Sequence, residues 1–426
     1  MDKRFSVLFN ITEEAALRLL QTPLEKLDDP SARYAAACHL VHFKSPRTIR
    51  ALIEAIENCD DQLYNRITKR KAIETLGRFK AEEALPVIRK CLADDDCYTV
   101  ENAVWAIGEI GTTDDSLLEE ITALLAKPGQ NYRVIIQTLA RLQYEPAADS
   151  IRPFLAYNDD CVVSAAISAL ARLEGDYSQV SRLLDFLQSP NVNVRRGVIQ
   201  DLMDLNYYPA IPAIASCPVS IVFRLRGIRH LGENAIRGGV KSFSEVEPYL
   251  DQVIYDDPNT LELVHEYDAP PSVDFLIQEL YHTDFGRCYL AVKTLQQYHR
   301  QGLGEILMDT WQREAHNDYG AHYHVIRLWG RLKYQPAFDL LVEALENTAP
   351  QFQKSRAAAA LALANFGGYN VLHLLRKNIH TDIFDLKYAC LLALSQLGDW
   401  ETISQFRDDP DLLIREKAKS IFQKKS

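Results

Sequence analysis

The sequence predicts an all-α protein, a curved solenoid of paired helices, because it repeats itself with a helical pattern. Two apolar residues three positions apart recur along the chain, the first of each pair at positions 40, 76, 107, 139, 170, 202 and 228, and again at 295, 329, 363 and 394. The alternation of apolar and polar residues that marks half-buried strands is nearly absent. Such self-similarity is typical of stacked arrays, and it predicts about ten helix pairs of the HEAT-like kind.

The block from residue 94 to 127 shows one repeat most clearly. An acidic run at 94–96 supplies side chains that cap a helix start, and the apolar residues that follow lie largely on one side of a helix. Gly111 ends this helix, and a second helix runs through the leucines and isoleucine of 117–125. The same chemistry predicts helix starts after Asp159-Asp160 and after Ser189-Pro190-Asn191.

The array becomes irregular between residues 207 and 290. Prolines at 209, 212 and 218 crowd one repeat, Gly232 to Gly239 is interpreted as a loop, and further prolines stand at 258, 270 and 271. We therefore divide one continuous solenoid into three parts: N-terminal HEAT-like repeats at 1–206, irregular repeats or a bend at 207–290, and C-terminal HEAT-like repeats with a polar cap at 291–426.

Composition and charge exclude several classes of protein. The formal net charge is -11, from 47 basic and 58 acidic residues, which argues against a surface that binds nucleic acid. No apolar stretch approaches the roughly 18 to 20 residues of a membrane span. The N-terminal residues lack the apolar core of a signal peptide. We expect a cytoplasmic protein without a membrane span.

The familiar motifs of cofactor and metal chemistry are missing. The eight cysteines are scattered and contain no Cys-x-x-Cys, so neither a zinc ribbon nor a redox dithiol is indicated. The glycine-rich nucleotide motifs, His-Glu-x-x-His and Gly-x-Ser-x-Gly are absent as well. We expect no metal and no cofactor, and any catalysis must be of a kind that these motifs do not serve.

Two polar clusters of the first half are candidates for ligand binding. In the run 64–70, Arg66 and Lys69 can clamp carboxylates, although the run can equally be an ordinary solvated helix face. Glu101 and Trp105 are four apart and share a helix face, with a further acid four residues on. Acids beside an indole suit a flat, partly cationic ligand, but they are also what a partly buried tryptophan with solvated neighbours looks like.

An arginine cluster follows in the second half. Arg226 and Arg229 are three apart and share a helix face, whereas Arg224 points elsewhere. Together they can bind carboxylates from two sides. The alternative is a set of structural salt bridges between repeats.

The run 316–324 places three histidines, an aspartate and two tyrosines at a helix junction. Asp318 can hold ring N–H groups, and Tyr319 or a histidine can move a proton. The alternative is that Asp318 simply caps the following helix. A metal held by His322 and His324 is disfavoured, because side chains two apart on a helix diverge.

Three segments, Tyr34–Phe43, Tyr64–Phe79 and Tyr98–Gly111, resemble the phycobilin lyases of the E/F type, above all their phycoerythrin-directed branch. The resemblance implies a bilin lyase of the phycobilisome, which adds a cysteine thiol of an acceptor subunit across the exocyclic double bond of ring A of an open-chain tetrapyrrole. For this chain it implies attachment of phycoerythrobilin to the α or β apo-subunit of phycoerythrin through a thioether. The bilin is then a substrate, and the reacting cysteine belongs to the acceptor.

Two alternatives stay open. Some members of the resembled family also isomerise phycoerythrobilin to phycourobilin during attachment, so the chain is either a simple lyase or a lyase-isomerase. A different class of protein, a non-catalytic HEAT-repeat adaptor or chaperone for phycobilisome proteins, would suit an extended solenoid surface as well.

Bilin chemistry then assigns hypothetical roles to the candidate residues. The pyrrole nitrogens call for a carboxylate, the two propionates for cations, and the flat conjugated face for aromatic rings. The predicted site comprises Asp318 as the pyrrole-binding or proton-handling acid with Tyr319 beside it, Arg66, Lys69, Arg224 and Arg226 as propionate ligands, and Glu101 and Trp105 as walls of the groove.

Overall fold

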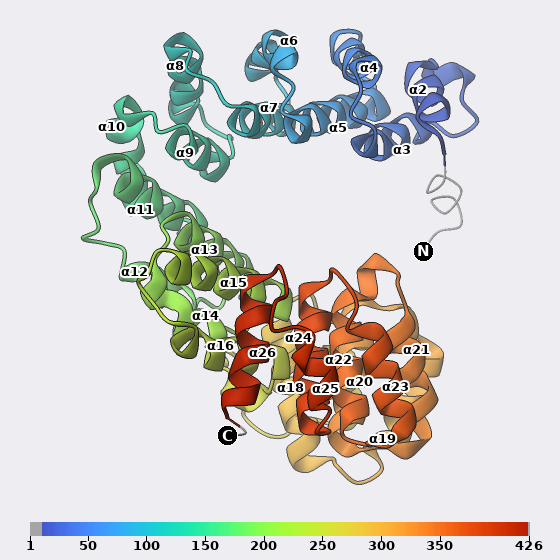
Figure 1. Ribbon diagram of the computed structural model, residues 1–426. Coiled ribbons are helices and arrows are strands. Elements are labelled where there is room, and N and C mark those ends of the chain that lie inside the picture. The colour runs from blue at the N-terminus through green and yellow to red at the C-terminus, as the bar shows by residue number, and fades with distance from the viewer. Residues whose placement is uncertain (1–10, 425–426) are drawn as a thin grey trace. The chain divides into compact units, whose positions relative to one another are not determined.

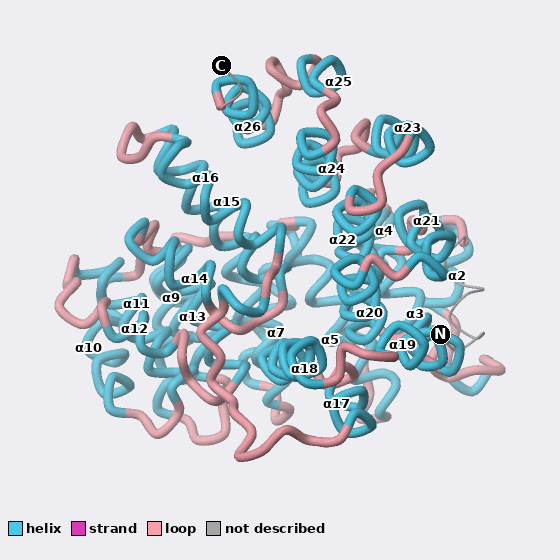
Figure 2. The backbone as a smooth tube through the Cα atoms, turned by 90° about the horizontal axis from the view of Figure 1, so that it is seen from below, coloured by secondary structure: helices cyan, strands magenta, loops and turns pink. Residues whose placement is uncertain are grey.

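The computed structural model describes residues 11–424, and within that range every regular element is a helix (Figures 1 and 2). The prediction of an all-α fold is therefore confirmed. None of the helices in the described range is long and apolar enough to cross a membrane. The chain forms two compact units, and the division between them falls between Val180 and Ser181. The three-part division at residues 206 and 290 stays a prediction. The two units are described separately.

The first unit is a regular array of helix pairs. Within it α3, α5, α7, α9 and α11 each contact the next, so they form one continuous layer, and each also packs on a partner helix. The pairs are α2 (Glu13–Gln21) with α3 (Ala32–His39), α4 (Pro46–Glu57) with α5 (Leu63–Phe79), α6 (Leu85–Lys90) with α7 (Cys97–Ile110), α8 (Asp115–Ala123) with α9 (Tyr132–Arg141), and α10 (Ala148–Ile151) with α11 (Asp160–Glu174).

The predicted helix starts and ends of this unit are present in the structure. The carboxylate of Asp96 accepts a hydrogen bond from the backbone N–H of Thr99 at 3.1 Å, and Asp159 accepts from Cys161 N–H at 2.8 Å. Gly111 follows the last residue of α7 with φ of +88°, a conformation that a side chain disfavours. Capping and glycine signals in the sequence thus locate these helix ends correctly.

The second unit continues the pairing. Its helices are α12 (Arg182–Phe186), α13 (Val192–Asp204), α14 (Ile211–Ser216), α15 (Ile221–Arg237), α16 (Phe243–Tyr255), α17 (Val273–Glu279), α18 (Phe285–Tyr298), α19 (Leu303–Arg313), α20 (Tyr319–Leu332), α21 (Phe338–Glu346), α22 (Gln353–Ala364), α23 (Tyr369–Asn378), α24 (Phe384–Gln396), α25 (Trp400–Ser404) and α26 (Leu412–Gln423). Helices α18, α20, α22, α24 and α26 contact one another in succession.

The predicted loop at Gly232 to Gly239 is wrong, because α15 continues through Gly232 to Arg237. A Cβ at Gly232 would lie 2.7 Å from Cγ1 of Val246 on α16, so this glycine allows two helices to approach closely. The irregularity of the region lies further on, where residues 261–272 form a non-helical segment before α17.

The second unit closes on itself. Helix α16 contacts α22, α24 and α26 in addition to its neighbour α15, so the last helix of the chain packs against α15 and α16 (Figure 1). The buried Lys417 of α26 donates to Glu247 of α16 at 2.8 Å and to Asp251 at 2.6 Å. The hydroxyl of Tyr388 on α24 donates to Asp251 at 2.7 Å. Three helices are therefore tied together by one group of buried polar contacts.

We predict that Lys417→Met destabilises the second unit by about 3 kcal/mol, because it leaves two carboxylates without their buried cation. Burial alone would raise the pKa of Glu247, but Lys417 and its other partners hold that pKa below its ordinary value. The pairing therefore stabilises the fold above the ordinary pKa of a glutamate, and this contribution is lost as the pH falls and Glu247 takes up a proton. Urea unfolding followed by tryptophan fluorescence at pH 7 and pH 4 should show a smaller penalty at the lower pH.

A matched control is Lys419→Met on the same helix. Lys419 pairs with Glu416 at the surface, and surface pairs of this kind contribute little to stability. Equal losses of stability in the two variants would contradict the role given to Lys417.

Candidate functional site

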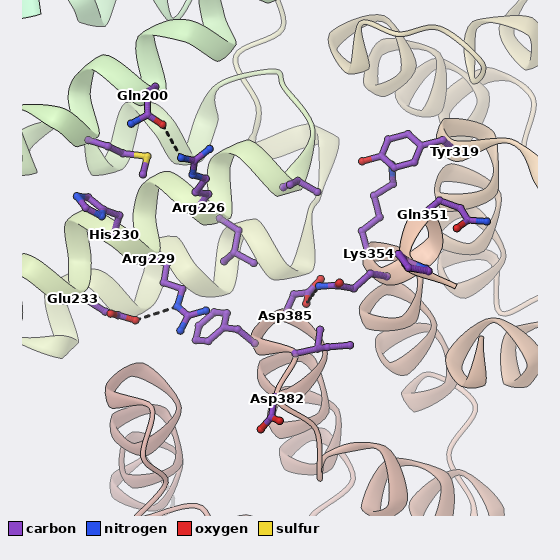
Figure 3. Close-up of a pocket in the computed structure, with 17 residues that line it drawn as sticks. Gln200, Arg226, Arg229, His230, Glu233, Tyr319, Gln351, Lys354, Asp382 and Asp385 are labelled. Atoms are coloured by element: carbon purple, nitrogen blue, oxygen red, sulfur yellow. Dashed lines mark hydrogen bonds and ion pairs between the residues drawn. The ribbon is translucent and has the colours of Figure 1, made fainter. Parts of the chain in front are cut away.

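The second unit contains a cavity of about 910 Å³ between α15 and the starts of three alternate helices (Figure 3). One wall comes from α13 and α15, and the opposite wall comes from the first residues of α20, α22 and α24. Beside apolar residues, both walls contain polar and charged ones: Gln200, Arg226, Arg229, His230 and Glu233 on one side, and Tyr319, Gln351, Gln353, Lys354, Asp382 and Asp385 on the other.

Two arginines of α15 line the first wall. Arg226 donates to the neutral amide of Gln200 at 2.8 Å, and it has no carboxylate partner in the described part of the chain. Arg229 donates to Glu233 at 3.0 Å and to Asp411 at 2.6 Å. The expectation that Arg226 and Arg229 share a helix face is confirmed. Arg226 is the member of the pair whose charge is available to a ligand.

Lys354 is the buried cation of the opposite wall. Its residue is only 3 % exposed, and its Nζ lies 3.0 Å from the centre of the Tyr319 ring and 4.6 Å from that of Phe285. Within residues 11–424 this Nζ has neither a hydrogen-bond acceptor nor an ion-pair partner. Because burial disfavours the charged form, the pKa of the Lys354 ammonium falls to about 7.

Asp385 is the acid of this wall. It is the second residue of α24, partly buried, and the Gln353 amide donates to its carboxylate at 3.4 Å. Burial raises the pKa of the Asp385 carboxyl above its ordinary value. The cavity therefore contains a carboxyl group that can accept N–H donors when ionised and give up a proton when it is not.

Of the predicted pair at residues 318 and 319, the structure places only Tyr319 in the cavity wall (Figure 3). Asp318 is the N-cap of α20, and one of its carboxylate oxygens accepts from Gly320 N–H at 2.8 Å and from Ala321 N–H at 2.7 Å. Asp318 therefore caps the following helix, which was the alternative to a role in binding the bilin. Asp318 is absent from the cavity lining.

The prediction that Arg224 binds a propionate is not compatible with its position. The side chain is fully buried, and its guanidinium donates to Asp256, to the Tyr289 hydroxyl at 3.0 Å and to the backbone oxygen of Val219 at 3.0 Å. All of these partners are protein groups of the core, so Arg224 fastens α15 to the end of α16 and to α18. The charge of Arg224 is paired with that of Asp256 in the core.

The other four predicted residues belong to the first unit. Arg66 and Lys69 lie on α5, where Lys69 pairs with Asp94 at 2.7 Å. Glu101 and Trp105 lie on the neighbouring helix α7, and Trp105 is partly buried. None of the four lines the cavity of the second unit. Their roles in binding a bilin stay predictions.

The histidine cluster is mostly core. His322 stacks on Phe352 with ring centres 4.1 Å apart, and its Nδ1 lies 2.9 Å from the Ser355 hydroxyl. His324 is buried between aromatic rings of α18 and α20. Burial lowers the pKa of His322 to about 4 and that of His324 to about 3, so both rings are neutral near pH 7.

The eight cysteines are free thiols that do not line the cavity. Burial raises the pKa of Cys91 to about 11 and those of Cys217 and Cys390 to about 12, which suppresses the thiolate form. These three have the character of small apolar residues, as the sequence suggested.

Comparison with known proteins decides the family. Residues 62–140 match the model of HEAT repeats, and residues 32–58 match that of the PBS lyase HEAT-like repeat. The Uncharacterized phycocyanin operon protein Y of Pseudanabaena tenuis (strain PCC 7409) is 52% identical over 99% of this chain and 100% of its own length. The Bilin biosynthesis protein CpeY of Synechococcus sp. (strain WH8020) is 35% identical over 88% of this chain and 91% of its own. The chain belongs to the E/F-type phycobilin lyases.

A solved structure agrees with this assignment. The complex of CpcE and CpcF of phycocyanin lyase from Nostoc sp. PCC7120 contains a chain that superimposes with a TM-score of 0.50 at 26% identity. The match covers 95% of that chain and 57% of this one. The HEAT-repeat architecture of this phycobilin lyase is thus shared with an experimentally determined relative.

Lys354 and Asp385 are the residues of this phycobilin lyase that sequence reasoning missed. Each is an ordinary residue in the first turn of a helix, and no short motif surrounds it. One signal was available: Tyr319, Lys354 and Asp385 occupy the first or second position of α20, α22 and α24, so they recur with the period of the repeats. Aligning the repeats by their helix starts would have grouped them.

We predict that Lys354→Met makes the fold more stable at pH 7, by about 4 kcal/mol, because it removes a buried group whose pKa is depressed from the ordinary 10.5 to about 7. Below pH 7 the cost of the buried charge is fully present. Between about pH 7 and 10.5 the unfolded chain binds more protons at this lysine than the folded chain, so the cost disappears as the pH rises.

Urea unfolding of both proteins at pH 7 and pH 9.5 checks this, with the exposed Lys293→Met of α18 as the control. A stability difference that stays the same at both pH values would show that Lys354 keeps an ordinary pKa.

Proposed function

We propose that this phycobilin lyase attaches phycoerythrobilin to a cysteine of a phycoerythrin subunit through a thioether, with the bilin held in the cavity of the second unit. The similarity to the Bilin biosynthesis protein CpeY supports a bilin as the ligand, and the choice of phycoerythrobilin and phycoerythrin follows from the resemblance of the sequence to the phycoerythrin-directed branch. The observation that carries the proposal is the charge pattern of the cavity: one wall has the Arg226 guanidinium, whose partner is a neutral amide, and the other has the buried amine of Lys354 and the poorly solvated carboxyl of Asp385.

The cavity suits an open-chain tetrapyrrole in size and in chemistry. Its volume of about 910 Å³ lies within the range of sites that bury small organic ligands. The guanidinium of Arg226 can pair with a propionate, and the half-exposed ring of Tyr319 can lie against the conjugated plane. Asp385 can accept the pyrrole N–H groups.

In this arrangement Asp385, not Asp318, is the acid of the reaction. Asp385 borders the cavity, whereas Asp318 is occupied by the backbone N–H groups of α20. A carboxyl group with a raised pKa can protonate the bilin, and a protonated bilin accepts a thiol more readily at ring A.

The addition balances without a further reactant. The S–H bond of the acceptor cysteine breaks, a C–S bond forms at the exocyclic carbon of ring A, and a proton joins the neighbouring ring carbon as the double bond becomes single. The contribution of the lyase is to hold the bilin in one orientation, so that one face and one cysteine react.

The test is co-expression of the protein with a phycoerythrobilin-producing pathway and each phycoerythrin subunit in turn, followed by absorption spectra and mass spectrometry of the tryptic peptides. We expect an adduct with the phycoerythrobilin spectrum on one cysteine. The same peptide with a phycourobilin spectrum would make the protein a lyase-isomerase. The absence of an adduct on every subunit would overturn the proposal in favour of an adaptor or of a lyase that needs a second chain.

We predict that Asp385→Asn slows attachment about 100-fold or more, because it removes the group that donates the proton. The matched variant is Asp318→Asn, which should attach bilin at close to the normal rate, since asparagine is as good an N-cap as aspartate. Initial rates of adduct formation by the two purified variants check this. The reverse order of rates would assign the acid to Asp318.

A further inference from the structure

The cavity wall contains a cation whose counterion is missing from the fold. Lys354 is 3 % exposed, and its Nζ meets aromatic rings in place of a carboxylate. The ring of Tyr323 completes this surrounding at 5.6 Å. Attraction between an ammonium and ring faces offsets only part of the cost of removing the charge from water. In the described part of the chain the Nζ of Lys354 has no hydrogen-bond acceptor and no carboxylate in contact with it.

One of these rings is less confined than the other two. Phe285 and Tyr323 are buried, with 3 % and 1 % of their surface exposed, but Tyr319 is 48 % exposed and is the first residue of its helix. Figure 3 shows the side chain of Lys354 running along the cavity wall to the ring of Tyr319. Rotation of that one ring would bring the Nζ of Lys354 into the cavity.

We propose that Lys354 is a carboxylate-binding subsite of the cavity, covered by the Tyr319 ring in the free protein, and that a ligand carboxylate takes the place of the ring. This inference rests on the proposed function, because it takes the bilin as the ligand of the cavity. A carboxylate reaches the site from one of two sources: a propionate of the bilin, or an acidic side chain of the acceptor subunit.

Binding a carboxylate at this subsite changes the protonation of the lysine. In the free protein the pKa of Lys354 is about 7, so at pH 8 most molecules carry a neutral amine. A carboxylate beside the Nζ favours the ammonium, and the complex then takes up a proton from solution. At pH 6 the lysine is already protonated, so little uptake occurs.

Other charged groups surround Lys354, and they can also exchange protons when a ligand binds. On the core side the groups that interact with it electrostatically are Asp256, Cys288, Asp318, His322 and His324. Across the cavity the charged or titratable groups are Arg226, Arg229, His230, Glu233, Asp382 and Asp385. Comparison of variants at position 354 therefore isolates the contribution of the lysine.

The experiment is titration calorimetry of the full chain with phycoerythrobilin at pH 8 and pH 6, in buffers of different ionisation enthalpy. With a free pKa of about 7 we expect uptake of about 0.9 proton per bilin at pH 8 and about 0.1 at pH 6. The dimethyl ester of the bilin, which has no free propionate, should bind without this uptake. Uptake with the apo-subunit alone would instead assign the carboxylate to the acceptor.

Two substitutions separate a carboxylate subsite from a merely structural lysine. Lys354→Met should weaken bilin binding about 10- to 100-fold and abolish the uptake. Lys354→Arg should keep most of the affinity but also abolish the uptake, because a guanidinium remains protonated at both pH values. The exposed Lys293→Met is the control and should behave like the parent protein.

Absorption of the bilin distinguishes failure of this inference from failure of the proposed function. A parent protein that shifts the bilin spectrum without proton uptake, or a Lys354→Met variant with undiminished uptake, would overturn the subsite and leave the bilin site intact. A protein that neither shifts the spectrum nor releases heat with phycoerythrobilin would overturn both.

Discussion

The second unit depends on the buried ion pair between Arg224 and Asp256. Burial alone would raise the pKa of Asp256, but the charge of Arg224 and the hydrogen bonds of its other partners hold that pKa below its ordinary value. The same carboxylate accepts from the hydroxyls of Tyr289 at 3.1 Å and Tyr323 at 2.5 Å. One acid therefore joins α15, the end of α16, α18 and α20. Since a buried charge that loses its partner is costly, these four helices must keep their mutual positions, and they fix the distance between the two walls of the cavity.

This pair also explains why the repeat pattern breaks where it does. A regular array places each helix pair on the one before it, whereas here the chain leaves α16 at Asp256 and crosses residues 261–272 before the next pair begins. A second buried acid, Asp284, lies beyond α17, where it caps α18 and pairs with Arg195 at 2.5 Å, and it contacts this segment through the ring of His265 at 2.9 Å. The irregular region is therefore held by specific ion pairs, and its departure from the repeat allows the unit to close.

Local sequence signals predict the helices. The positions of Gly232 and Arg224 depend on contacts between residues far apart in the sequence, which local signals do not reveal. The carboxylates that cap helices and the glycine that ends α7 act within a few residues, so the sequence contains them in readable form. Gly232 was misread because a glycine that ends a helix and one that admits a neighbouring helix look alike until the neighbour, Val246, is known. Asp318 was placed in the site for its chemistry, yet its position at a helix start already favoured the cap. Arg224 belongs to a core pair whose partner is 32 residues away.

The sequence pattern of a single repeat does not predict the cavity, but a comparison between repeats groups some of its residues. Arg226 and Lys354 line one cavity in a unit whose helix α16 contacts α22, α24 and α26, and no pattern within a single repeat encodes those contacts. Tyr319, Lys354 and Asp385, however, each lie at the first or second position of a helix, in α20, α22 and α24 respectively. When an array of repeats curves around a cavity, residues at the same position of several repeats can line one wall of that cavity. Stability alone would favour an apolar side chain at the buried position of Lys354, and the proposed ligand, which carries complementary groups, would account for an amine there.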